Sequence, residues 1–251
     1  MNKHREWTDA QIDYYLEGIQ HSDYPALFWQ LMQPYLSGCR TIIDIGSGPG
    51  AFALRAAEDG FKVQAVDSSR KSLDVLEVEA SGYAAGTIKT ICGNWPNVSV
   101  DHCDAAICAY SFGGDIGTPR GIAKIFKVTG RVIFFISPVE KTQVDFLSRE
   151  LYEEEGSSPP EFKGNYHDIK DILAALKVNY SVETVSYDFG FPLRDWSEID
   201  QCALFLADKL GLSSAGRLKK HLEKIVTYRN NLLWVPNPRV SALITCIGSE
   251  Q

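Results

Sequence analysis

Thr41-Ile42-Ile43-Asp44-Ile45-Gly46-Ser47-Gly48-Pro49-Gly50-Ala51 is an apolar run that ends in a carboxylate and continues into a glycine-rich turn. Four of the five residues from 41 to 45 are β-branched, which is typical of a central parallel strand buried on both faces. Residues 51–59 favour a helix, and Gly60 stands at the position of a left-handed C-terminal cap. Such a strand, turn and helix bring backbone N–H groups and a helix N-terminus to a ligand bound over the strand end. The stretch therefore predicts a nucleotide-cofactor site.

The glycine turn fits two cofactor patterns. Residues 46–51 match GxGxxA of the dinucleotide-binding folds, and together with Asp44 they match DxGxGxG. A second apolar run, 62–67, ends in Asp67, which is placed to bind a ribose diol in either pattern. Asp44 distinguishes them, because it lies two residues before the first glycine and glycines follow at alternate positions. This arrangement resembles the first motif of class I S-adenosylmethionine-dependent methyltransferases, and Asp67 followed by Ser68-Ser69 resembles their second.

The resemblance covers residues 41–138 by motif and the rest by the order of elements. It implies an α/β fold, a Rossmann-like seven-stranded, mostly parallel sheet with helices on both faces and an antiparallel last strand. It also implies S-adenosylmethionine as the cofactor. The residues that match cofactor-binding positions are Asp44, Gly46, Ser47, Gly48, Gly50, Asp67, Ser68, Asn94, Trp95, Ala109 and Tyr110.

Two of these positions follow the third expected strand, residues 87–92. Asn94 matches the place where the family binds the adenine amine through an acidic or amide side chain. Trp95 either stacks on the adenine or fills the edge of the sheet. Asp104 is expected to open the fourth strand, whose exit is expected to face the methionine part of the cofactor and the acceptor. No Asp/Asn-Pro-Pro-aromatic string occurs at this exit, which disfavours nucleobase amines as acceptors.

The N-terminal segment, residues 1–39, predicts a helical cap. Thr8 and Gln11 have the spacing of a capping box, so a helix is expected to begin at Asp9. Two interpretations stay open: the helix packs on the core, or it is a flap that presents Tyr14 or Tyr15 to the substrate. If the reaction uses a general base, Tyr110 and Tyr15 are the first catalytic candidates.

The later chain continues the alternation of helices and strands. Helices are expected at 118–127, 139–155 and 168–177, and strands at 130–138, 180–189 and 240–247. The expected division is one domain of residues 1–251, with the cap at 1–39, the cofactor-binding core at 40–192, a helical insertion at 193–239 and the last strand at 240–251. The insertion is expected to be a substrate lid, with a simple helical pair or a dimer contact as the alternative.

Composition agrees with a single enzyme-sized domain. The chain has 251 residues and a formal net charge of −7. Because sequence-independent binding of nucleic acid needs a basic surface, no nucleic-acid partner is expected. Six cysteines occur without a CxxC pair, which favours reduced core residues and a cytoplasmic protein. The five histidines lack metal-ligand spacing. No apolar run reaches membrane-spanning length, so no membrane partner is expected, and the chain is expected to be a monomer or a homodimer.

Several functions remain in view. The leading prediction is an S-adenosylmethionine-dependent methyltransferase acting on a small-molecule acceptor. A non-catalytic S-adenosylmethionine-binding or regulatory protein, a protein methyltransferase and an NAD-dependent oxidoreductase are the alternatives. The sequence does not identify the acceptor or the methylated atom.

Overall fold

A seven-stranded sheet forms the centre of the computed structural model, which describes residues 7–248. Its strand order is β3-β2-β1-β4-β5-β10-β6. The first five strands in this order pair in parallel, whereas β10 is antiparallel to both β5 and β6. The predicted α/β class and antiparallel last strand are confirmed. The strands are β1 (Thr41–Ile45), β2 (Lys62–Asp67), β3 (Ile88–Cys92), β4 (Cys103–Ala109), β5 (Thr129–Pro138), β6 (Ser181–Asp188) and β10 (Pro238–Ile247).

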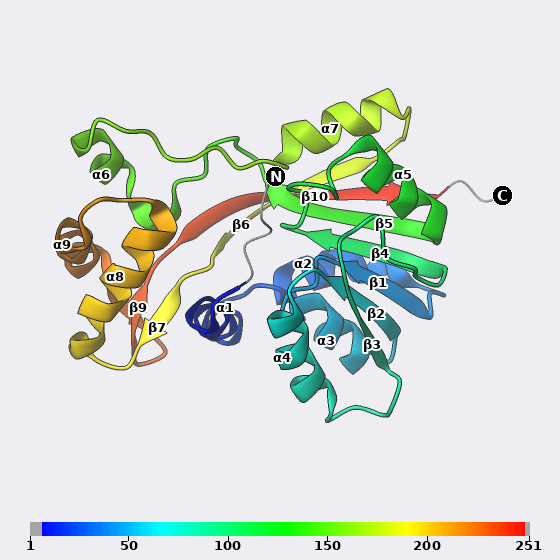
Figure 1. Cartoon of the computed structure of the whole chain (residues 1–251), viewed down its shortest axis with the longest axis horizontal. Coiled ribbons are helices and arrows are strands. Elements are labelled where there is room, and N and C mark those ends of the chain that lie inside the picture. Colours follow the sequence, from blue (N-terminus) through cyan, green and yellow to red (C-terminus); the bar gives the residue numbers. More distant parts are fainter. Residues whose placement is uncertain (1–6, 249–251) are drawn as a thin grey trace.

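Helices cover both faces of this sheet (Figure 1). One face carries α2 (Ala26–Met32), α3 (Ala51–Glu58) and α4 (Arg70–Ala80), and the other carries α5 (Pro119–Val128) and α7 (Tyr166–Ala175). Neighbouring residues of β1 show why two layers are needed, because Ile42 packs into the first core and Ile43 into the second. A strand that is apolar on both sides has to be covered on both sides.

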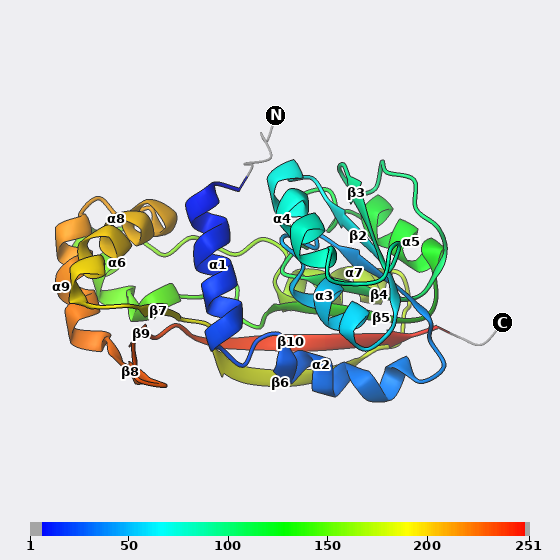
Figure 2. The same ribbon diagram turned by 90° about the horizontal axis from the view of Figure 1, so that it is seen from below.

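The helix α1 (Asp9–His21) begins where the sequence predicts. The Thr8 hydroxyl accepts the Gln11 backbone N–H at 3.3 Å, and the Gln11 side chain accepts the Thr8 N–H at 3.0 Å. Figure 2 shows α1 between the sheet with its helices and a smaller unit at the other end of the molecule. Tyr14 points to that unit, where its ring packs on Phe205, while Tyr15 packs against the first core. The helix therefore joins two apolar clusters.

The smaller unit contains a sheet that the sequence analysis missed. The insertion, residues 191–235 in the structure, holds the two expected helices, α8 (Ile199–Leu210) and α9 (Ala215–Ile225). It also forms a three-stranded antiparallel sheet in the order β7-β9-β8. The strands are β7 (Phe191–Leu193), β8 (Thr227–Arg229) and β9 (Leu232–Val235). Runs of three or four residues are too short to show an alternating pattern.

The expected helix over 139–155 is wrong for most of its length. Only α6 (Arg149–Glu154) is helical, after a 3₁₀ turn at Asp145–Leu147. Phe146 and Leu147 both have φ near +55°, which an α-helix does not allow. The buried Phe146 ring belongs to the apolar cluster of the insertion, and its N–H donates to Asn237 Oδ1 at 2.9 Å. Tertiary contacts thus override local helix preference here. Further 3₁₀ turns lie at Gln33–Leu36 and Trp196–Glu198.

All six cysteines are free, and four of them are buried. Cys92 is exposed, contrary to the expectation of core cysteines, because β3 is an edge strand of the sheet. Within residues 7–248, no helix has the length and apolar character needed to cross a membrane.

Candidate functional site

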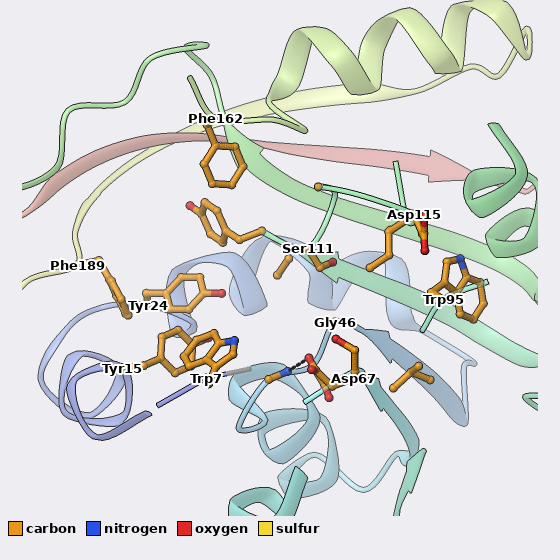
Figure 3. Close-up of a pocket in the computed structure, with 18 of the residues that line it drawn as sticks. Trp7, Tyr15, Tyr24, Gly46, Asp67, Trp95, Ser111, Asp115, Phe162 and Phe189 are labelled. Carbon is orange, nitrogen blue, oxygen red and sulfur yellow. Dashed lines mark hydrogen bonds between the residues drawn. The ribbon is translucent and has the colours of Figure 1, made fainter. Parts of the chain in front are cut away.

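A cavity of about 450 Å³ opens at the carboxyl ends of β1, β2, β3 and β4. Figure 3 shows Gly46, Asp67, Ser111 and Trp95 on one side and a group of aromatic rings that includes Tyr15, Tyr24 and Phe189 on the other. Nine of the eleven predicted cofactor-binding residues line it. These are Gly46, Ser47, Gly48, Asp67, Ser68, Asn94, Trp95, Ala109 and Tyr110.

The glycine turn and Asp67 are tied together by hydrogen bonds. Asp67 Oδ2 accepts the Gly48 N–H at 2.8 Å, and its Oδ1 accepts the Ser69 N–H at 2.8 Å. The N–H groups of Gly46 and Ser47 donate to the Val66 carbonyl at 2.8 and 3.1 Å. The exits of β1 and β2 therefore form one rigid polar wall of the cavity.

Gly46 is required by both conformation and space. Its φ is +75°, and a Cβ at this position would lie 2.1 Å from Ser111 Cβ. Ser111 is itself held in place, because its hydroxyl donates to the Ile45 carbonyl at 2.7 Å. A side chain at position 46 would push the exits of β1 and β4 apart, and the wall of the cavity with them.

Asp44 and Gly50 lie behind the turn and do not border the cavity. Asp44 is 2% exposed, and burial raises its pKa to about 7, with a further contribution from Asp67 and an opposing hydrogen bond from the Ala53 backbone. Within the described residues its Oδ2 has no hydrogen-bond partner. Gly50 caps the start of α3 with φ +101°. Both residues support the turn from the core side.

Trp95 and Asn94 border the cavity where β3 ends. The Trp95 ring is 3% exposed and packs in the second core, and its Nε1–H donates to the Gly121 carbonyl at 2.9 Å. Lys124 Nζ lies 4.4 Å from the Trp95 ring centroid. The ring therefore fills the edge of the sheet, which was one of its two expected roles, while also touching the cavity. The Asn94 side chain is exposed beside it.

A cluster of tyrosines forms the opposite side of the cavity. The Tyr110 hydroxyl contacts the Tyr187 hydroxyl and lies 2.5 Å from Ser241 Oγ. Tyr24 packs on both rings. Burial raises the pKa of Tyr110 and of Tyr15 well above the usual tyrosine range. Both phenols are therefore protonated at neutral pH, which fits hydrogen-bond donation and opposes direct use as a base.

Three charged side chains, Arg239, Asp145 and Lys209, line the same cavity as these tyrosines. Arg239 Nη2 lies 2.8 Å from Asp145 Oδ1, and both side chains are largely buried, at 14% and 19% exposure. Lys209 from α8 also lines the cavity. Burial lowers the pKa of Lys209 and Arg239 lowers it further, whereas Asp145 raises it.

None of these charged residues was predicted from the sequence, although one feature of the sequence pointed to Arg239. The last strand was expected to be antiparallel, so its beginning lies at the edge where the parallel strands end. Arg239 is the second residue of β10 and pairs in register with Tyr187 near the end of β6. The expected topology thus places both at the cofactor edge of the sheet.

Asp104 lies at the start of β4, where it was expected. Its Oδ2 accepts the N–H groups of Arg40 and Thr41 at 2.7 and 3.0 Å and the Thr41 hydroxyl at 3.0 Å. These bonds join the starts of β1 and β4, at the edge of the sheet opposite the cavity. Within residues 7–248, no group of three or more His, Cys, Asp or Glu side chains is arranged to hold a metal ion.

Comparison with known proteins identifies the fold. No protein-family model matches the sequence, and no curated protein matches it by sequence. Among solved structures, the magnesium protoporphyrin IX methyltransferase of Synechocystis PCC 6803, with bound S-adenosylhomocysteine, has a TM-score of 0.54 at 13% identity and aligns 98% of this chain with 90% of its own. A putative methyltransferase of Bacillus halodurans C-125 has a TM-score of 0.56 at 14% identity, over 90% of this chain and 100% of its own.

A third similar structure is the phosphoethanolamine N-methyltransferase 2 of Haemonchus contortus, in complex with phosphomonomethylethanolamine and S-adenosylhomocysteine. Its TM-score is 0.59 at 14% identity, and the alignment covers 98% of this chain and 59% of that one. Together with the strand order of the seven-stranded sheet and its one antiparallel strand, β10, these similarities show that the chain has the class I S-adenosylmethionine-dependent methyltransferase fold.

Proposed function

We propose that this protein is an S-adenosylmethionine-dependent methyltransferase that acts on a small-molecule acceptor. The observation that carries the proposal is the pair of Asp67 and the glycine turn at the cavity wall. Each Asp67 oxygen receives one backbone N–H, and a carboxylate has further lone pairs for the two hydroxyls of a ribose.

The residues around the cavity suit the whole cofactor. Asp67 is proposed to bind the ribose, and Asn94 with Trp95 to border the adenine. Gly46 and Gly48 allow close approach of the backbone, and Gly48 has open space where a Cβ would stand. Ala109 and Tyr110 are proposed to face the methionine part. The cofactor supplies a methyl group on a positively charged sulfur, which is already activated for transfer.

The remaining task of the protein is to orient the acceptor. Alignment of reacting groups contributes up to roughly 7–11 kcal/mol in favourable cases. The rings of Tyr15, Tyr24, Phe162 and Phe189 line the cavity, and we propose that they border the acceptor and keep water away from it. Because the pKa values of Tyr15 and Tyr110 are raised by burial, we propose that these hydroxyls position the acceptor by donating hydrogen bonds.

Calorimetric titration of the ligand-stripped protein with S-adenosylhomocysteine tests the cofactor assignment. We expect saturable binding that is weakened at least about tenfold by Asp67→Ala, since charge-assisted hydrogen bonds are worth about 1.5–3 kcal/mol. Asp101→Ala is the matched control, because Asp101 is 76% exposed, pairs with Lys89 and lies away from the cavity. NADH is expected not to bind. If NADH binds and S-adenosylhomocysteine does not, the methyltransferase proposal is wrong and the glycine turn is a dinucleotide-binding motif.

A non-catalytic binding protein would bind the cofactor and leave S-adenosylmethionine unconsumed with every acceptor class tried, including peptides and proteins.

We also propose a cytoplasmic location, which the free cysteines support because structural disulfides belong to oxidising compartments.

A further inference from the structure

A second cavity, of about 280 Å³, lies next to the first, between α1 and the insertion. The two cavities share four lining residues, which are Trp7, Tyr15, Phe189 and Lys209. The two cavities are therefore neighbours that meet at these four side chains.

The walls of the second cavity are mainly aromatic. The Tyr14 ring stacks on Phe205 with centroids 4.1 Å apart and meets Phe191 edge-on at 4.7 Å. Phe146 and Phe189 complete the apolar lining. Asn237 also borders it, but its Oδ1 is already bonded to the Phe146 N–H. This wall suits an apolar group, because aromatic side chains bury large areas of nonpolar surface.

Two basic side chains border the first cavity on the side of the insertion, and one of them, Lys209, borders the second cavity as well. Arg239 pairs with Asp145 Oδ1 at 2.8 Å, and the same oxygen also accepts a hydrogen bond from Gln143 at 3.0 Å. Lys209 borders both cavities, and its Nζ lies 6.0 Å from the centroid of the Phe146 ring. Within residues 7–248, the buried Nε of Arg239 has no hydrogen-bond partner. A buried donor without a partner is costly, so a ligand that supplies an acceptor oxygen here is favoured.

We propose that the acceptor is a small organic oxyanion, a carboxylate or a phosphate, whose acidic group lies between Lys209 and Arg239 and whose apolar part fills the second cavity. This inference rests on the proposed function and names the substrate class for the same site. The two basic side chains and the unpartnered Arg239 Nε select the anion, and the aromatic walls of Tyr14, Phe191 and Phe205 select the apolar part.

Matched probes test this assignment in protein saturated with S-adenosylhomocysteine. Hydrocinnamate and hydrocinnamamide have the same apolar body and differ in charge, and phenethyl phosphate replaces the carboxylate by a phosphate. We expect at least one of the two anions to bind about tenfold or more tightly than the amide. The ratio between the two anions then identifies the acidic group.

Two variants separate the charge from the apolar contact. Lys209→Met is expected to remove most of the preference for the anion, whereas Lys220→Met, on the exposed side of α9, is expected to leave it unchanged. Phe205→Ala is expected to weaken the anion and the amide by the same factor. S-adenosylhomocysteine affinity is expected to stay constant in all three variants, which shows that they are folded.

Equal affinity for anion and amide, or no binding of any probe at millimolar concentration while S-adenosylhomocysteine binds normally, would overturn the inference and leave the proposed function intact. Failure of S-adenosylhomocysteine itself to bind would contradict the proposed function, and the inference with it. The same titrations thus distinguish the two failures.

Discussion

Gly46 combines a positive φ of +75° with a close approach to Ser111. A left-handed backbone costs a non-glycine residue roughly 1–2 kcal/mol, and the overlap of a new Cβ with Ser111 Cβ adds to that. We expect Gly46→Ala to lower the free energy of unfolding by about 2 kcal/mol or more and to weaken S-adenosylhomocysteine binding. Urea unfolding and calorimetry measure the two effects.

Gly60→Ala is the control for that variant. Gly60 has φ +88° but no heavy atom within 4 Å of its hypothetical Cβ. We expect Gly60→Ala to lower the free energy of unfolding only by the backbone cost of roughly 1–2 kcal/mol and to leave the affinity for S-adenosylhomocysteine unchanged. Equal losses of stability and affinity in the two variants would contradict the role assigned to the Gly46–Ser111 contact.

Asp44 gives a prediction for pH. Burial raises its pKa from 3.8 to about 7, so the folded state holds a proton that the unfolded state has lost between about pH 4 and pH 7. Stability contributed by this group is therefore present below the unfolded pKa and falls as pH rises through the window, by on the order of 4 kcal/mol. Asp44→Asn is expected to remove this fall.

Urea unfolding at several pH values across that window measures the effect. The difference in stability between Asp44→Asn and the unaltered protein is expected to move in favour of the variant as pH rises. The exposed Asp101→Asn serves as the comparison and is expected to follow the unaltered protein. Parallel stability curves for all three proteins would show that Asp44 does not titrate in this range.

Among the elements, α1 contributes to the walls of both cavities. Tyr15 and the preceding Trp7 border both cavities, and their rings meet edge-on with centroids 5.2 Å apart. We expect S-adenosylhomocysteine to slow amide hydrogen exchange in residues 9–21. The helix α9 lies at the far side of the insertion (Figure 1), and its exchange is expected not to change. Unchanged exchange in α1 upon saturation would favour simple packing on the core over a flap.

The strength of local patterns explains which elements the sequence predicted. Residues 41–45 and 130–138 are long enough and apolar enough to be recognised as buried strands, and Thr8 and Gln11 mark a helix start through their own hydrogen bonds. The strand at 191–193 has no such length. Phe146 is held in a left-handed conformation by residues that are distant in the sequence, such as Asn237. Local sequence preference does not predict a conformation that depends on such contacts.

At the scale of the whole molecule, the two halves of the site differ in how they can be predicted. The cofactor half consists of turns that directly follow single strands, as at Gly46 and Asp67. Its residues are therefore close together in the sequence and can be recognised as a motif. The acceptor half brings Tyr15, Lys209 and Arg239 together from the first helix, the insertion and the last strand. Their proximity depends on topology and packing, and only Tyr15 was predicted from the sequence.

We propose that the cavity at the ends of β1, β2, β3 and β4 holds S-adenosylmethionine. A crystal structure of the protein with S-adenosylhomocysteine tests it most directly. We predict ribose hydroxyls within hydrogen-bond distance of the Asp67 carboxylate, the adenine beside Asn94 and Trp95, and the sulfur directed to the side of Tyr110. A ligand bound elsewhere, or one whose ribose does not contact Asp67, would contradict this assignment of the cofactor site.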